Sequence, residues 1–355
     1  MPRKRKSSKS TVLAGKGSID RTARPPSILH TPITQMRAMW SEGVYWNTKQ
    51  EALTFLEACT NGGFNTVIAN VWHGYGVNWN TTYDGLQWDS RYTQPSFDPS
   101  AHLIAEAHNR NVTVYAWFTC GSQGHAIHDA WRENGGTFAA NGAGHFDFTN
   151  ASFVSWLTGL IVDFVTKNPT IDGIVLDYIR FSNSPTGPLY GNQAARVAVI
   201  SSAIQAIKTA IRAIHPTIRL SCWGQAHQGT PIGKTWRDMG NDMTQWVHEG
   251  LIDIGWDGLY EEDPSTAFQA YEGMLQSIAH GDRLYPVVAN YTTGVVARTP
   301  ANLAQVLGKA QLAVPAAAGL GVYVYNPTLY TAAHADYLRQ GLFRSPARVS
   351  PLLST

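Results

Sequence analysis

IDGIVLDYIRF, residues 171–181, is a short apolar run with an aspartate near each end. Such a run predicts a buried strand, and buried strands rarely contain carboxylates. Asp172 precedes the strand beside a glycine, where we expect a turn or capping residue. Asp177 comes near the end of the strand, and alternation places it on one face with Gly173 and Val175. The fold must therefore give this face a polar environment at the carboxyl end of the strand.

Seven further segments share this character, because they are short, rich in β-branched or aromatic residues and bounded by turn residues. In chain order, the eight predicted strands cover residues 36–46, 66–72, 112–118, 171–179, 217–224, 251–260, 283–291 and 319–326. Helical periodicity with cap or stop residues predicts helices between them, over residues 49–63, 100–111, 150–169, 194–216, 243–250, 265–281 and 300–313. Eight strands alternating with helices close most economically into a (β/α)8 TIM barrel. An open doubly wound sheet is the alternative, but the glycine-rich phosphate turn typical of its first strand is absent.

Composition agrees with one soluble globular domain, since 44% of the 355 residues are hydrophobic and 15% are charged. The charge is unevenly spread. Residues 1–25 contain eight basic and one acidic side chain, whereas the rest of the chain contains 19 basic and 24 acidic ones. We therefore expect a basic N-terminal arm over residues 1–32, a single barrel over 33–345 and a C-terminal tail over 346–355.

The basic arm is interpreted first as a solvated, disordered segment. The alternatives are a contact with nucleic acid or an attachment to other chains of a larger assembly. The mildly acidic body is not predicted to bind nucleic acid. No run of about 18 apolar residues predicts a membrane span, and no apolar segment after the basic start predicts a secretion signal. The composition leaves the compartment open between the cytoplasm and a virion.

Position in a barrel separates the acidic residues by role. Polar residues at the carboxyl ends of barrel strands are functional candidates, and those at the amino ends are structural. Asp177 is at a carboxyl end, where the alternative is a buried structural ion pair with Arg180. A glycosidase needs one carboxylic acid to protonate the leaving oxygen and a second carboxylate to attack the sugar or to activate water. Asp257, Glu261 and Glu262, near the end of the sixth predicted strand, are the candidates for the partner of Asp177.

Tryptophan is abundant, with 12 residues, and several tryptophans fall late in predicted strands. Flat indole rings at a barrel mouth suit the apolar faces of sugar rings. Packing in the core is the alternative for each ring, because tryptophan is largely buried on average. The tryptophans in these positions are Trp46, Trp72, Trp117, Trp223 and Trp256.

Histidines also follow the predicted strands. His73 comes after the second strand, and His125, His128 and Asp129 lie in a long polar segment over 119–150, after the third. There is no HExxH motif and no compact set of ligands, so no metal or other cofactor is predicted. His73 and His128 are instead predicted to form hydrogen bonds in a polar cleft. The three cysteines form no CxxC motif and are expected to be buried and reduced.

The order of these segments resembles the glycosyl hydrolase-like family ten barrels, distant relatives of the α-amylase-type glycosidases. The resemblance runs from about Arg37 to Tyr325. It is densest over 146–181, which resembles a family stretch ending in Asp-Gly-x-x-x-Asp-Tyr-x-Arg-Tyr through Asp172, Gly173, Asp177, Tyr178 and Arg180. A second stretch, 242–260, is similar in Asp242, Trp246, Gly250, Asp253 and Tyr260. A third pairs the strand 112–118 with His128 and Trp131, which resemble a His-Pro-x-Trp element without its proline.

The resemblance implies carbohydrate hydrolysis at the carboxyl face of the barrel, with Asp177 as the leading catalytic carboxylate. Two departures affect the substrate class. The chain reads NVWHGYG where the family usually has an arginine late in the second strand, and it has Asp257 where the family has a proline.

Two functions follow from these features. The first is a metal-independent glycoside hydrolase acting on a poly- or oligosaccharide, with Asp177 as nucleophile or base and an acid from Asp257, Glu261 or Glu262. The second is a non-catalytic glycan-binding or structural barrel within a larger assembly such as a phage virion. In both cases the residues predicted to hold the sugar are His73, Trp72, Trp117, His128, Tyr178, Arg180, Trp223, Trp256 and Tyr260.

Overall fold

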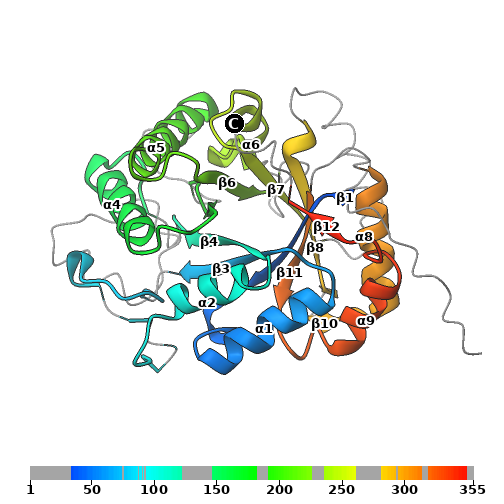
Figure 1. The fold of residues 1–355 in the computed structure, drawn as a ribbon. Helices are drawn as coiled ribbons and strands as arrows, with labels where there is room; N and C mark the ends of the chain where they lie inside the picture. Colours follow the sequence, from blue (N-terminus) through cyan, green and yellow to red (C-terminus); the bar gives the residue numbers. More distant parts are fainter. Residues whose placement is uncertain are drawn as a thin grey trace, which may run out of the picture. The chain divides into compact units, whose positions relative to one another are not determined.

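The computed structural model describes residues 33–73, 76–86, 88–89, 91, 93–121, 146–181, 191–225, 236–260, 281–292, 295–313 and 319–349. Eight parallel strands close into a barrel, in the order β11-β2-β3-β4-β5-β6-β7-β8 (Figure 1). They are β2 (Met36–Ser41), β3 (Thr66–Trp72), β4 (Thr113–Thr119), β5 (Gly173–Asp177), β6 (Arg219–Gly224), β7 (Ile254–Leu259), β8 (Leu284–Ala289) and β11 (Gly319–Tyr325). Each overlaps one of the eight predicted strands, so the TIM-barrel prediction is confirmed.

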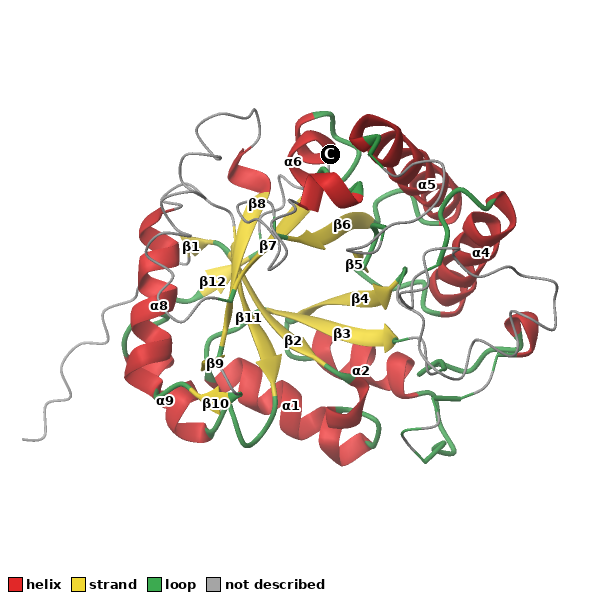
Figure 2. Cartoon of the chain, turned by 180° about the vertical axis from the view of Figure 1, so that it is seen from behind, coloured by secondary structure: helices red, strands yellow, loops and turns green. Residues whose placement is uncertain are grey.

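Helices surround the barrel (Figure 2). The described ones are α1 (Lys49–Asn61), α2 (Pro99–His108), α4 (Ala151–Lys167), α5 (Gln193–Ile214), α6 (Met243–His248), α8 (Pro300–Ala313) and α9 (Ala332–Gln340). Short 3-10 turns occur at η1 (Gly43–Tyr45), η2 (Tyr83–Gly85), η3 (Trp236–Met239) and η4 (Gly281–Arg283). The helix predicted over 265–281 falls almost entirely outside the described residues.

Local sequence explains where the helices begin. Thr48 and Glu51 form a reciprocal capping box at the start of α1, which satisfies two of the backbone N–H groups that a helix start leaves unpaired. Asp98 accepts a hydrogen bond from Ala101 N before the proline that opens α2. Asn150 caps α4 in the same way. These caps pair backbone N–H groups at the first turns and so determine where the helices begin.

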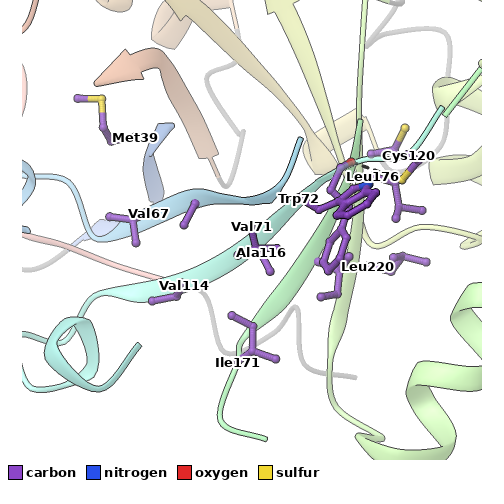
Figure 3. Close-up of a cluster of buried hydrophobic side chains, with 14 of the residues drawn as sticks. Met39, Val67, Val71, Trp72, Val114, Ala116, Cys120, Ile171, Leu176 and Leu220 are labelled. Carbon is purple, nitrogen blue, oxygen red and sulfur yellow. Dashed lines mark hydrogen bonds between the residues drawn. The ribbon is translucent and has the colours of Figure 1, made fainter. Parts of the chain in front are cut away.

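Alternation along the strands separates two apolar layers. Residues of one parity fill the barrel interior, where the rings of Trp40 and Trp256 meet edge to face at 4.8 Å. Residues of the other parity pack outward against the helices, as Figure 3 shows for side chains such as Val67, Val114 and Leu176. Because both faces are buried, the strands read as continuous apolar runs rather than alternating ones.

Charged groups at the amino ends of the strands are structural. The carboxylate of Asp172 pairs with His108 at 2.9 Å and accepts a hydrogen bond from Val114 N at 2.7 Å, which ties α2 and β4 to the start of β5. The carboxylate of Asp253 pairs with Arg212 in the same manner. Asp172 is thus structural, but it acts by linking α2 and β4 to β5 and not as the expected turn or capping residue.

The two ends of the described barrel meet in a short parallel pair, β1 (Ile33–Thr34) with β12 (Ala347–Arg348). Ala347 and Arg348, which lie beyond the predicted end of the barrel at residue 345, therefore belong to regular structure. The predicted arm over 1–32 lies outside the described residues. Helix α5 is long and apolar enough to cross a membrane by length and composition alone. In this structure one face of the helix, which includes Ile200 and Ile204, is buried, whereas Ile214 at its end is exposed.

Candidate functional site

A cavity of about 180 Å³ opens among the carboxyl ends of the barrel strands. Its walls are almost entirely aromatic, with one carboxylate. A groove of about 650 Å³ between α4 and α5 is larger, but its lining contains no ionisable side chain. Because barrel enzymes build their sites at the carboxyl ends of the strands, the barrel cavity is the candidate site. It is lined by Trp40, His73, Trp117, Asp177, Tyr178, Trp223, Tyr260, Tyr291 and Tyr323.

Asp177 reaches this cavity because β5 is regular. A side chain at Gly173 would collide with the ring of Tyr115 in the barrel interior, and Val175 also belongs to the interior layer. Ile174 and Leu176, of opposite parity, pack outward. Asp177 is therefore the third inward position of the strand and the one at its carboxyl end, as strand alternation predicted.

The Asp177 carboxylate is buried, with 5% of the residue exposed, and both of its oxygens accept hydrogen bonds. Trp117 Nε1 donates to Oδ2 at 2.9 Å, and Tyr178 N donates to Oδ1 at 2.6 Å. Burial raises the pKa of Asp177 to about 6, and these two donors and the charge of Arg180 oppose the increase only in part. A carboxyl group that changes protonation state near neutral pH is suited to proton transfer.

The backbone after Asp177 is unusual. Tyr178 has a φ of 50°, in the left-handed region that a side chain with a Cβ rarely adopts. This conformation costs about 1–3 kcal/mol and is found where the surrounding structure enforces it. Here it accompanies the short hydrogen bond from Tyr178 N to Asp177, and the Tyr178 side chain lines the cavity. The strain is therefore located at the residue that holds the carboxylate.

Arg180 is buried beside the cavity and does not line it. Its guanidinium carbon lies 4.9 Å from the centre of the Tyr178 ring and 4.6 Å from that of Trp236. The hydrogen bonds that described residues give Asp177 come from Trp117 and Tyr178. A structural ion pair with Arg180 is therefore not what holds the carboxylate, although the arginine contributes a positive charge nearby.

Aromatic rings in mutual contact form another part of the wall. The rings of Tyr260 and Tyr323 are stacked at 5.2 Å, and the ring of Trp223 lies 5.7 Å from that of Tyr260. Tyr323 is placed by Asn290, which donates to Val324 O at 2.8 Å and accepts from Val324 N at 3.3 Å. The Tyr323–Val324 peptide bond is cis.

A bulge near the end of β3 determines the directions of Trp72 and His73. The register with β4 shifts between Asn70 and Trp72, so one extra residue enters the strand. Val71 and Trp72 then both pack outward, and His73 turns inward to the cavity. Burial and then the charge of Arg91 lower the pKa of His73, which favours its neutral form. Trp72 contacts Trp156 on the helix side, away from the cavity, and Figure 3 shows it among the outer apolar side chains.

The structure does not bring all the other predicted residues to the cavity. Trp256 is fully buried below it, between Trp40 and Tyr285. Asp257 is also fully buried and has the parity of Leu259, which packs outward. Trp117, Trp223 and Tyr260 do line the cavity, whereas Trp46 is buried in the outer layer. Glu261, Glu262 and His128 lie outside the described residues.

Sequence reasoning missed three cavity residues. Trp40 lies on the first barrel strand, and Tyr323 alternates inward on the last one, so strand parity was the signal that could have found both. Tyr291 belongs to β9 (Tyr291–Thr292), which pairs with β10 (Val296–Ala297) beyond β8, and no local pattern points it to the cavity. Within the described ranges, no three His, Cys, Asp or Glu side chains are grouped closely enough to hold a metal ion.

A closed (β/α)8 barrel with a buried carboxylate and aromatic walls at its carboxyl face has the architecture of the TIM-barrel glycoside hydrolases. Solved structures agree on the fold. The PgaB (BpsB) glycoside hydrolase domain from Bordetella bronchiseptica superposes with a TM-score of 0.59 at 10% identity, covering 89% of this chain and 100% of that one. The endo-1,4-beta-mannanase from Rhizomucor miehei has a TM-score of 0.59 at 13% identity, covering 86% and 95%.

Residues 35–304 match the family described as Glycosyl hydrolase-like 10, and the chain belongs to that family. The resemblance inferred from the sequence is thus confirmed. Glycosyl hydrolase DigH from Escherichia coli (strain K12) is 24% identical over 295 residues, covering 68% of this chain and 61% of that protein. The chain therefore spans less than two thirds of the length of the curated relatives that it matches.

Proposed function

We propose that this protein hydrolyses the glycosidic bonds of a poly- or oligosaccharide at the carboxyl face of its barrel. Membership of a glycosyl hydrolase-like family and the shared fold support a glycosidase in general terms. The observation that carries the proposal is Asp177, a buried carboxylate with a raised pKa that faces an aromatic cavity. A scaffold function would not require a charged group in this position, because burying it destabilises the fold.

Asp177 is assigned the role of proton donor. The sequence suggested a nucleophile or base, but a glycosidase distinguishes its two carboxylates by environment, and the buried one with the higher pKa is the acid. With a pKa of about 6, Asp177 is largely protonated in mildly acidic solution. It can then give its proton to the glycosidic oxygen as the bond to the anomeric carbon breaks.

The cavity walls supply binding surfaces for the sugar. The rings of Trp223, Tyr260 and Tyr323 line the cavity and give its wall an apolar surface for a pyranose. The imidazole of His73, whose neutral form is favoured by burial, adds a polar group to the cavity wall that can bind a sugar hydroxyl. Arg180 acts from behind the wall, where its charge acts on Asp177 and its guanidinium packs against Tyr178.

The test is a panel of bacterial and plant polysaccharides that includes β-1,4-mannan, xylan, starch and peptidoglycan, assayed for the release of reducing ends. The wild-type protein is expected to cleave at least one of them, and Asp177→Asn to abolish cleavage while remaining folded. Asp336→Asn, an exposed aspartate on α9, is the matched control and keeps full activity. Full activity of Asp177→Asn would refute the assignment.

The second candidate function is a non-catalytic glycan-binding barrel. It is favoured by one observation, that Asp177 is the single carboxylate among the described residues lining the cavity. Binding of a polysaccharide by the wild type and by Asp177→Asn, with no product from either, would support it over hydrolysis. Attachment to a larger assembly depends on the predicted arm over 1–32, which lies outside the described residues and stays a prediction.

A further inference from the structure

Glu42 is an acidic residue at the barrel mouth to which no role has been given above. It directly follows Ser41, the last residue of β2, and its backbone is extended, with a φ of −76° and a ψ of 156°. Strand alternation therefore continues through Glu42. Trp40, two residues earlier, belongs to the interior layer and lines the cavity. Glu42 thus has the same inward direction one layer higher, at the mouth.

The charge of Glu42 acts on three residues of the cavity wall. Burial is the largest cause of the raised pKa values of Tyr291 and Tyr323, and the negative charge of Glu42 comes next. The same charge opposes the lowering of the His73 pKa by burial and Arg91. Tyr323 is also affected by the charge of Asp177. Glu42 itself does not line the cavity, but its charge and that of Asp177 both reach Tyr323, which does.

The Glu42 carboxylate is available for chemistry. The residue is partly exposed, and among the described residues no side chain forms a hydrogen bond or ion pair with its carboxylate. Its described hydrogen bonds are made by the backbone oxygen, which accepts from Tyr45 N at 3.1 Å and from Ser41 Oγ at 3.2 Å. The carboxylate of Glu51, nine residues later, is by contrast occupied, because it accepts a hydrogen bond from Thr48 N at the start of α1.

The barrel separates the two carboxylates. β2 and β5 are three positions apart around the wall, with β3 and β4 between them. At about 4.8 Å per strand spacing, their inward side chains approach one another across the mouth rather than side by side. This arrangement suits the wider carboxyl separation of roughly 6.5–9.5 Å, which leaves room for a water molecule between the sugar and a general base.

Building on the glycosidase function proposed above, we propose that Glu42 is the general base of this site and Asp177 its general acid. Asp177 gives its proton to the leaving glycosidic oxygen as the bond between that oxygen and the anomeric carbon breaks. Glu42 removes a proton from a water molecule, whose oxygen forms the new bond to the anomeric carbon from the opposite face. The step leaves Asp177 ionised and Glu42 protonated, and proton exchange with solvent restores both. The anomeric configuration is inverted.

The position of Glu42 can be tested without a substrate. Glu42→Gln removes a negative charge near the cavity, so the pKa of His73 is expected to fall, as followed by NMR titration of the imidazole in the full chain. Glu57→Gln, which changes an exposed glutamate on α1, is the matched control and leaves the His73 titration unchanged. An unchanged titration in Glu42→Gln would place the carboxylate away from the cavity and overturn the proposal.

The catalytic role is tested with the panel polysaccharide that releases the most reducing ends. Glu42→Gln is expected to lower kcat by about 10²–10⁴-fold, with the thermal unfolding midpoint unchanged. Proton NMR of the first wild-type product should show the inverted anomer. Azide, which needs no base, should restore turnover of Glu42→Ala and give the inverted glycosyl azide.

The outcomes separate the two proposals. Full kcat in Glu42→Gln, or a retained anomer from the wild type, would overturn the role of Glu42 as base and leave Asp177 in place. Absence of reducing ends from the wild type with every polysaccharide would overturn the glycosidase function and the role of Glu42 with it.

Discussion

Replacing Asp177 by asparagine should change how the stability of the protein depends on pH. The pKa of Asp177 is about 6 in the folded protein and about 4 in an unfolded chain. Between these values the folded protein keeps a proton that the unfolded chain has released, so stability falls as pH rises from about 4 to about 6. Two pKa units at about 1.4 kcal/mol each correspond to about 3 kcal/mol. Asparagine does not ionise, so the free energy of unfolding of Asp177→Asn does not include this decrease.

The assay is urea unfolding of both proteins at pH 4 and pH 7.5. The free energy of unfolding of Asp177→Asn, relative to the wild type, should rise by about 3 kcal/mol between the two pH values. The neighbouring Arg180 and Tyr323 keep their charge states over this range, and His73 titrates in both proteins, so their effects cancel to first order. Asp172→Asn, just before the amino end of the same strand, is the matched control, and its half-buried pair with His108 should produce no such gain. A relative stability of Asp177→Asn that stays constant or falls between pH 4 and pH 7.5 would refute the reasoning.

Three further variants test two residues of the cavity wall and one in the core below it. Trp117→Phe removes the N–H donor to the ionised Asp177, a hydrogen bond of about 1.5–3 kcal/mol. An NMR titration should therefore show the pKa of Asp177 raised by about one to two units. A lowered pKa of Asp177 would contradict this reasoning. Trp256→Ala should lower the free energy of unfolding in urea by about 3–5 kcal/mol, because a fully buried ring leaves a cavity in the core. Trp223→Ala should instead weaken binding to the polysaccharide that the wild-type protein cleaves, as measured by affinity electrophoresis. Its loss of stability should be smaller than that of Trp256→Ala. A larger loss of stability in Trp223→Ala than in Trp256→Ala would contradict the placement of Trp223 in the cavity wall and of Trp256 in the core.

The fold could be predicted from the sequence because its signals are local. Apolar runs bounded by turn residues mark the strands, and caps such as Thr48 with Glu51 mark where helices begin. The inward direction of Asp177 could be predicted for the same reason, since β5 is regular from Gly173 onward. Alternation counted along a regular strand needs no knowledge of the neighbouring strands.

Part of the site could not be predicted, because it depends on contacts between strands. The bulge after Asn70 exchanges the directions of Trp72 and His73, and nothing in the sequence NVW announces an extra residue. Sequence reasoning assigned both side chains to the sugar, yet only His73 lines the cavity. A bulge is a mismatch with the partner strand, so the register of β3 against β4 has to be known first.

Depth in the barrel is the second property that local patterns omit. Trp223 and Trp256 are paired neighbours on β6 and β7, and both face the interior, but only Trp223 lines the cavity. The ring of Trp223 lies against Gly258, two residues beyond Trp256 on β7, so it occupies the next layer toward the mouth. Strands in a closed barrel are tilted, and paired positions therefore need not lie at the same height along the axis. A larger side chain at Gly258 would meet the Trp223 ring, so this glycine keeps the indole at the level of the cavity, whereas Trp256 remains in the core below.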